Sequence, residues 1–138
     1  MNLSPSDAAR RLMSNFILDA STVLVVLQEE AGADDAMEYF AGASISTVNM
    51  AEVLTKLIEK GRDPVKALEV FELLQLNVVE FDQEHAKKAA ELRPLTKHLG
   101  LSLGDRCCLA FAILSESTAV TADRQWKKVK SCSVEVVR

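Results

Sequence analysis

The sequence lacks the features that mark secreted or membrane-bound proteins. It contains only three cysteines, an odd number, and Cys107 and Cys108 are neighbours in an apolar segment, where small buried hydrophobic residues are more common than disulfides or metal ligands. The longest apolar run, residues 16–27, is interrupted by Asp19 and is too short for a membrane span. No small-residue cleavage site follows it. We therefore expect a cytoplasmic protein with no membrane partner.

Positive charge is also scarce. The sequence has 16 Lys and Arg residues and 20 Asp and Glu residues, so the net charge is −4. The protein as a whole therefore has no positive field that would attract nucleic acid. A nucleic-acid substrate would need a local group of basic side chains. At 138 residues, 49% of them hydrophobic, the chain fits one globular domain. We expect a polar N-terminal leader over residues 1–14 and the domain over residues 15–138.

Strand-like and helix-like segments alternate along the domain. Short stretches rich in β-branched residues predict strands at 16–19, 44–48, 77–81, 118–123 and 133–137. Segments with helical spacing of apolar residues lie between them, at 20–30, 33–42, 49–61, 63–75, 82–100 and 102–117, with Gly61 and Gly100 as stops and Pro94 as a kink or end. This alternation predicts a three-layer α/β/α sandwich around a mostly parallel five-stranded sheet.

Four acidic residues lie near the predicted carboxyl ends of the strands, where parallel sheets bind ligands. Asp19 and Asp123 close predicted strands, Glu52 lies one turn into a helix, and Asp105 lies in the first turn of another. Ligands bind at the carboxyl ends of parallel strands, so we expect these four carboxylates to converge. Each has a simpler explanation as a helix cap, with residues 49–52 and 102–105 resembling capping boxes. Their apolar or small neighbours favour a cleft instead.

A cluster of carboxylates calls for a cation. Two carboxylates about 4 Å apart repel by roughly 4 kcal/mol at an effective dielectric near 20. Ligand sets made only of oxygen suit Mg²⁺ or Mn²⁺ better than Zn²⁺. Such ions activate water for attack on phosphorus. We therefore expect Asp105 to be a metal ligand as well as a helix cap.

Four segments in order carry a resemblance to a known family. They are ILDASTVLVVL, ISTVNMAEVL, GLSLGDRCCLAFA and AVTADRQWKKV, and together they resemble the PIN-domain ribonucleases, in particular the VapC toxins of toxin–antitoxin pairs. The resemblance implies a Mg²⁺- or Mn²⁺-dependent endoribonuclease that cleaves RNA with metal-activated water, often as a homodimer, inhibited by a cognate antitoxin protein. It places the family's acidic quartet on Asp19, Glu52, Asp105 and Asp123. It also suggests Ser21 and Thr121 as hydroxyls that orient these ligands, although both suit local turns.

Residues outside the quartet are less informative. Candidates for RNA contact are basic residues near the expected cleft, namely Arg106, Arg124, Lys127 and Lys128, with Lys97, His98 and Lys130 as further candidates. Each could equally belong to a solvated surface. We expect Trp126 to anchor a short helix to the core and His85 and His98 to be exposed. Excess apolar residues at 20–30 and 66–76 suggest a dimer interface or an antitoxin groove, although buried helices would look the same.

Two alternatives remain open. A Mg²⁺-dependent phosphatase or receiver-like domain also places Asp at strand ends, but the expected Asp-x-Asp is absent, since the sequence reads Asp19-Ala20-Ser21. The second is a catalytically silent PIN-like module that binds protein or RNA. Loss of an acidic residue would favour that module, and all four are present.

Overall fold

The described part of the chain folds around a parallel sheet. A computed structural model describes residues 14–137, so most of the predicted leader, residues 1–13, lies outside the described range. The strands are β1 (Phe16–Leu18), β2 (Ser44–Ser46), β3 (Asn77–Val79), β4 (Thr118–Thr121) and β5 (Val134–Val136). They pair in the order β3-β2-β1-β4-β5, and every pair is parallel. The predicted five-stranded α/β fold is confirmed.

Each strand ends earlier than predicted, and after β1, β2 and β4 the chain turns into a helix within a few residues. Asp19 is the N-cap of α2 (Ala20–Leu27), and Ser46 is the N-cap of α4 (Thr47–Glu59). Asp123 caps the short 3-10 helix η2 (Arg124–Lys128). Helices therefore begin just after the carboxyl ends of β1, β2 and β4. The first backbone amides of these helices, which have no hydrogen-bond partner within the helix, lie at one edge of the sheet.

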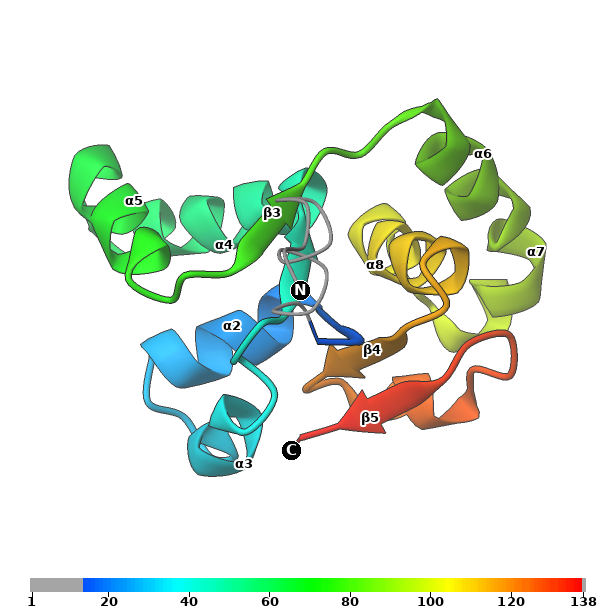
Figure 1. The fold of residues 1–138 in the computed structure, drawn as a ribbon, viewed down its shortest axis with the longest axis horizontal. Coiled ribbons are helices and arrows are strands. Elements are labelled where there is room, and N and C mark those ends of the chain that lie inside the picture. Colours follow the sequence, from blue (N-terminus) through cyan, green and yellow to red (C-terminus); the bar gives the residue numbers. More distant parts are fainter. Residues whose placement is uncertain (1–13, 138) are drawn as a thin grey trace, which may run out of the picture.

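Helices cover both faces of the sheet (Figure 1). On one side lie α2, α3 (Ala33–Met37), α4 and α5 (Pro64–Glu72). On the other side lie α6 (Gln83–Glu91), α7 (Arg93–Thr96), the 3-10 helix η1 (Lys97–Leu99) and α8 (Leu103–Leu114). The predicted helix at 82–100 is divided beside Pro94, and Gly61 and Gly100 adopt left-handed φ values of +102° and +69° where helices stop.

Two hydrophobic clusters follow from the alternation of side chains along the strands. Leu18 and Val120 face the cluster under α2, α4 and α5. Ile17 and Ala119 face the cluster under α6 and α8. Trp126 is fully buried in the second cluster, so the prediction that it anchors η2 is confirmed.

His85 departs from the sequence prediction. The sequence predicts an exposed helix face for this residue, but only 9% of it is accessible. Its ring stacks on Phe111 with centroids 5.3 Å apart and meets Phe81 edge-on at 5.6 Å. The close packing of α6 on α8 turns this face of α6 toward α8. His98 is exposed, as expected.

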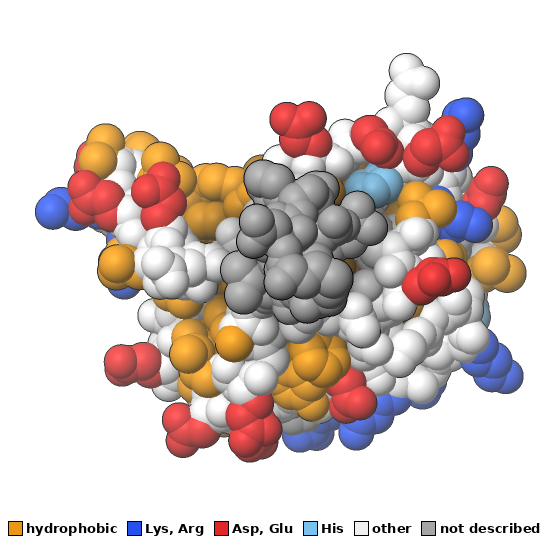
Figure 2. Space-filling model, in the orientation of Figure 1, with side chains coloured by type: hydrophobic (Ala, Val, Ile, Leu, Met, Phe, Trp, Pro, Cys, Tyr) orange, Lys and Arg blue, Asp and Glu red, His pale blue; other side chains and the backbone are white. Residues whose placement is uncertain are grey.

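Charge is unevenly distributed over the surface. In Figure 2, Asp and Glu side chains gather at the lower left, over α3, whereas Lys and Arg side chains gather at the lower right, below β5. No helix within residues 14–137 combines the length and hydrophobicity that crossing a bilayer requires.

Candidate functional site

Asp19 is the most buried of the four predicted carboxylates. Only 4% of it is exposed, yet its carboxylate makes no capping bond to α2. Instead, Oδ2 accepts hydrogen bonds from Ser21 Oγ at 2.7 Å and Thr121 Oγ1 at 3.0 Å. The two hydroxyls are 3.2 Å apart. Both predicted orienting residues therefore contact Asp19, and the second contact crosses from β1 to β4.

The same hydroxyls organise the backbone after β4. The amide of Ala122 donates to Ser21 Oγ at 3.0 Å, and that of Asp123 donates to Thr121 Oγ1 at 3.1 Å. Each hydroxyl thus donates to Asp19 and accepts from the turn that carries Asp123. This arrangement holds the two strand-end carboxylates in a defined relation.

Glu52 is positioned by two residues that sequence reasoning missed. Asn49 is fully buried, and its Nδ2 donates to Glu52 Oε1 at 2.7 Å and to the carbonyl of Gly104 at 3.1 Å. A Cβ on Gly104 would lie 2.6 Å from Glu52 Cδ. Glu52 therefore lies against the first turn of α8, where only a glycine leaves room for it.

The capping alternatives have different outcomes. The box at 102–105 is confirmed, because Asp105 Oδ2 accepts from the Ser102 amide at 2.9 Å and Ser102 Oγ accepts from the Asp105 amide at 3.2 Å. The box at 49–52 is wrong, because α4 begins earlier, at the Ser46 cap. The three-residue spacing of Asn49 and Glu52 resembles a helix cap in the sequence. In the structure the same spacing places both side chains on one face inside α4, where they form a hydrogen bond.

Asp123 also caps a helix. Its Oδ1 accepts from the Gln125 amide at 2.9 Å, as the simpler explanation anticipated. Capping and ligation are compatible, since a carboxylate has two oxygens and about four acceptor positions.

Burial, with a smaller contribution from neighbouring carboxylates, raises the pKa of Asp19, Glu52 and Asp105. Burial, opposed by the Ser21 hydrogen bond and reinforced by the charge of Asp105, raises the pKa of Asp19 to about 7. Burial also raises the pKa of Glu52, and the charge of Asp105 adds to this effect. Burial raises the pKa of Asp105 as well, and there the charge of Asp123 adds to it. The structure thus brings all four acids into one electrostatically coupled group.

The donor set fits a hard divalent cation. Its ligands are carboxylates, and the buried Asn49 Oδ1 beside Glu52 has no hydrogen-bond partner among the described residues, so another oxygen is available there. Within that part of the chain, no three His, Cys, Asp or Glu side chains lie close enough to hold an ion as they stand. The fit rests on donor chemistry and on the charge that a cation would neutralise.

The predicted RNA-contact residues separate into two groups. Arg106 Nη1 donates to the Ala89 carbonyl at 2.8 Å, so this guanidinium joins α8 to the end of α6. Arg124, Lys127 and Lys128 lie on η2 and are exposed, directly after Asp123.

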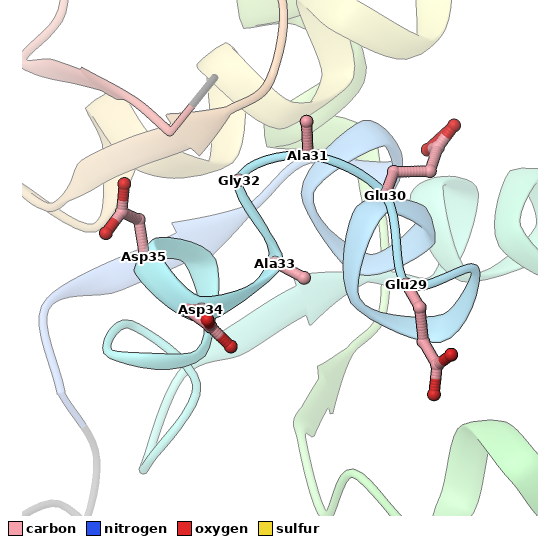
Figure 3. A pocket seen from close by; sticks show the side chains of 7 residues that line it. All are labelled: Glu29, Glu30, Ala31, Gly32, Ala33, Asp34 and Asp35. Carbon is pink, nitrogen blue, oxygen red and sulfur yellow. The ribbon is translucent and has the colours of Figure 1, made fainter.

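One hollow in the described part of the chain lies away from the carboxylates. It measures about 610 Å³ and lies in the loop between α2 and α3, at the opposite end of α2 from Asp19. Its acidic side chains are Glu29, Glu30, Asp34 and Asp35, and Figure 3 shows them pointing away from one another. They do not form a common binding centre.

Comparisons with known proteins place this geometry in a family. The model of the PIN domain matches residues 16–131. No curated protein matches the chain. Among solved structures, a chain of DNA-bound VapBC from Salmonella typhimurium aligns with a TM-score of 0.71 at 19% identity, covering 91% of this chain and 100% of that one.

Two further structures share the fold. A chain of Rickettsia felis VapBC2, bound to a fragment of promoter DNA, has a TM-score of 0.69 and 18% identity over 88% of this chain and 97% of that one. A chain of Mycobacterium tuberculosis VapBC-5, a member of the VapBC family of toxin–antitoxin systems, has a TM-score of 0.61 and 18% identity over 91% and 99%. The family match spans most of the domain, and the chain belongs to the PIN domain family.

Proposed function

We propose that this protein is a metal-dependent endoribonuclease whose centre consists of Asp19, Glu52, Asp105 and Asp123. The observation that carries the proposal is the buried Asp19 carboxylate, whose pKa is raised to about 7 beside Glu52 and Asp105. A protein core tolerates such a group poorly unless it is neutralised. The family match and the oxygen donor set support Mg²⁺ or Mn²⁺ as the neutralising ion.

The residues of this chain have distinct roles in that proposal. Asp19, Asp105 and Asp123 would hold the ion, with Glu52 binding it directly or through water. The bound ion would supply an activated water and neutralise charge on the phosphoryl oxygens. Ser21 and Thr121 keep Asp19 Oδ2 oriented and favour its ionised form. Asn49 holds Glu52 against α8.

RNA as the substrate is supported by the sequence resemblance and by local charge. The net charge of −4 opposes nucleic-acid binding, but η2 places Arg124, Lys127 and Lys128 directly after Asp123. Basic side chains beside the carboxylates can meet the backbone phosphates that flank the cleaved one. Arg106 is not included in this set because of its bond to α6.

A toxin–antitoxin role follows the structural neighbours, several of which come from VapBC complexes. We propose that the chain is the toxin of such a pair, inhibited by a cognate antitoxin, and that it forms a homodimer. Of the two apolar segments, α2 is largely buried. Exposed apolar side chains remain near α5 and can serve either interface: Ile58, Val65, Leu68 and Leu73.

The experiment is cleavage of a mixed RNA pool by purified protein with Mg²⁺, with Mn²⁺ and with EDTA, comparing wild type with Asp105→Asn. Asparagine keeps an oxygen for the Ser102 amide but removes one charge, so we expect a folded protein that no longer cuts. Asp63→Asn is the matched control, since Asp63 is also an N-cap, accepting from Val65 at 3.1 Å, at the distant α5. Cleavage at the wild-type rate by Asp105→Asn, or cleavage in EDTA, would contradict the proposal and favour a non-catalytic binding module.

A further inference from the structure

A second pocket lies between two segments that lead along the chain to Asp105 and Asp123. It has a volume of about 250 Å³ and forms where α7 and η1 meet η2 and the start of the loop to β5. The two walls are about 30 residues apart in the chain, so only the fold brings them together. The lining residues are Leu95, Thr96, His98, Lys128, Val129, Lys130 and Ser131.

The lining combines apolar surface with positive charge. Leu95 is 60% exposed and, with Val129, supplies hydrophobic surface open to solvent. Lys128 and Lys130 supply two ammonium groups, and His98 supplies an imidazole ring. No carboxylate lines this pocket in the described part of the chain. A flat, apolar base with a phosphate attached matches such a lining, because single-stranded recognition pairs base stacking with phosphate contacts.

Both walls lead to the proposed catalytic carboxylates. The η2 wall begins directly after Asp123, and the η1 wall ends at Gly100, shortly before Asp105. At about 2 Å of rise per residue in a 3-10 helix, Lys128 lies roughly 10 Å from Asp123. An RNA strand cut at the carboxylates would therefore reach the pocket within a few nucleotides.

The distribution of charged side chains favours one direction for an RNA strand that leaves the carboxylates. Glu29 in the loop between α2 and α3, and Asp34 and Asp35 in the first turn of α3, repel a polyanion. Figure 2 shows Lys and Arg side chains gathered at the lower right, away from the acidic side chains at the lower left. A strand that crosses the carboxylates is attracted toward η2 and repelled from α3.

We propose that the pocket between η1 and η2 binds one unpaired nucleotide of the RNA substrate, with its base on Leu95, Val129 and His98 and its phosphate at Lys128 and Lys130. This inference rests on the proposed ribonuclease function and deepens it. It assigns selection of single-stranded substrate to a site outside the carboxylate cluster.

Binding tests the pocket without relying on cleavage. The probe is a fluorescein-labelled oligouridine of about twelve nucleotides, titrated by anisotropy into full-length Asp105→Asn protein in EDTA. We expect Lys128→Ala with Lys130→Ala to weaken binding at least tenfold and to reduce the slope of log K against log salt by about 1.4, as two lost phosphate contacts require. The matched control is Lys60→Ala with Lys66→Ala, exposed lysines at the α4–α5 end, which should change binding less than about twofold.

A second variant tests the base contact. Leu95→Ser should weaken binding of the oligouridine several-fold and leave the salt slope unchanged, because it removes apolar surface and no charge. It should not affect a duplex RNA of equal length, whose paired bases cannot enter the pocket. Equal weakening by the two lysine pairs, or no effect of Leu95→Ser, overturns the proposal.

The outcomes separate this proposal from the function on which it rests. Wild-type protein that binds oligouridine through the pocket but never cuts RNA retains the nucleotide site and contradicts the nuclease. If the protein cuts RNA in a metal-dependent way but replacing Lys128 and Lys130 does not weaken oligouridine binding, the nuclease function is supported and the nucleotide site is contradicted.

Discussion

The side-chain amide of Asn49 lies 2.7 Å from Glu52 Oε1 and also donates to the Gly104 carbonyl at 3.1 Å. This buried amide joins α4 to α8 at the turn that carries Asp105. Because Glu52 also fills the space that a side chain at position 104 would occupy, the position of one carboxylate depends on the absence of a Cβ on the neighbouring helix.

Gly104→Ala should reduce RNA cleavage at least about tenfold while leaving stability within about 1 kcal/mol of wild type. Alanine favours the helix, but its methyl group displaces the Glu52 carboxylate from Asn49. The measurement is the cleavage rate together with urea unfolding. Leu114→Ala, at the far end of α8, is the control and should cut normally. A fully active Gly104→Ala protein would show that Glu52 needs no fixed position.

Ser21→Ala should weaken Mg²⁺ binding, and the weakening should grow as the pH falls. The Ser21 hydroxyl lowers the pKa of Asp19, so its loss raises that pKa and makes the proton a stronger competitor for the ion. Calorimetric titration with Mg²⁺ between pH 6 and pH 8 (about one unit either side of the Asp19 pKa) measures the effect. Ser115→Ala removes a hydroxyl that bonds only within its own helix end and turn and should change nothing.

The metal-free protein should be more stable at pH 5 than at pH 8. Between about 3.8 and about 7, folded Asp19 keeps a proton that the unfolded chain has lost, so the free energy of unfolding falls as the pH rises through this window. The contribution of Asp19 is at most about 4 kcal/mol. Urea unfolding in EDTA, comparing wild type with Asp19→Asn, measures it.

Asp19→Asn should show a smaller difference between pH 5 and pH 8 than wild type, because asparagine does not titrate. Adding Mg²⁺ at pH 8 should recover stability in wild type by neutralising the ionised carboxylates. If both proteins lose equal stability on going to pH 8, Asp19 is not the group responsible.

His85→Ala should destabilise the protein by about 3 kcal/mol, as truncation of a buried ring does, without changing cleavage per folded molecule. His85→Phe should preserve stability, because phenylalanine retains the stacking on Phe111 and removes Nδ1, which has no hydrogen-bond partner among the described residues. Denaturant unfolding distinguishes the two variants. An unchanged midpoint for His85→Ala would support the exposed position first predicted from the sequence.

Local patterns were sufficient to predict much of this protein. Strands, helices and the Ser102–Asp105 cap depend on residues a few positions apart, and all of these were predicted correctly in kind. Asp19 and Asp123 follow strands in the sequence, so any parallel sheet places them at its carboxyl edge. That these residues bind a metal stays a prediction.

Contacts between distant residues were decided by the tertiary structure. The order β3-β2-β1-β4-β5 sets β1 beside β4, and only then does Thr121 reach Asp19. Packing of α4 and α6 on α8 put Asn49 against Gly104 and buried His85, both of which sequence patterns misassigned. The physical reason is range: propensity, periodicity and capping act over a few residues, whereas these contacts depend on which elements pack together across the whole chain.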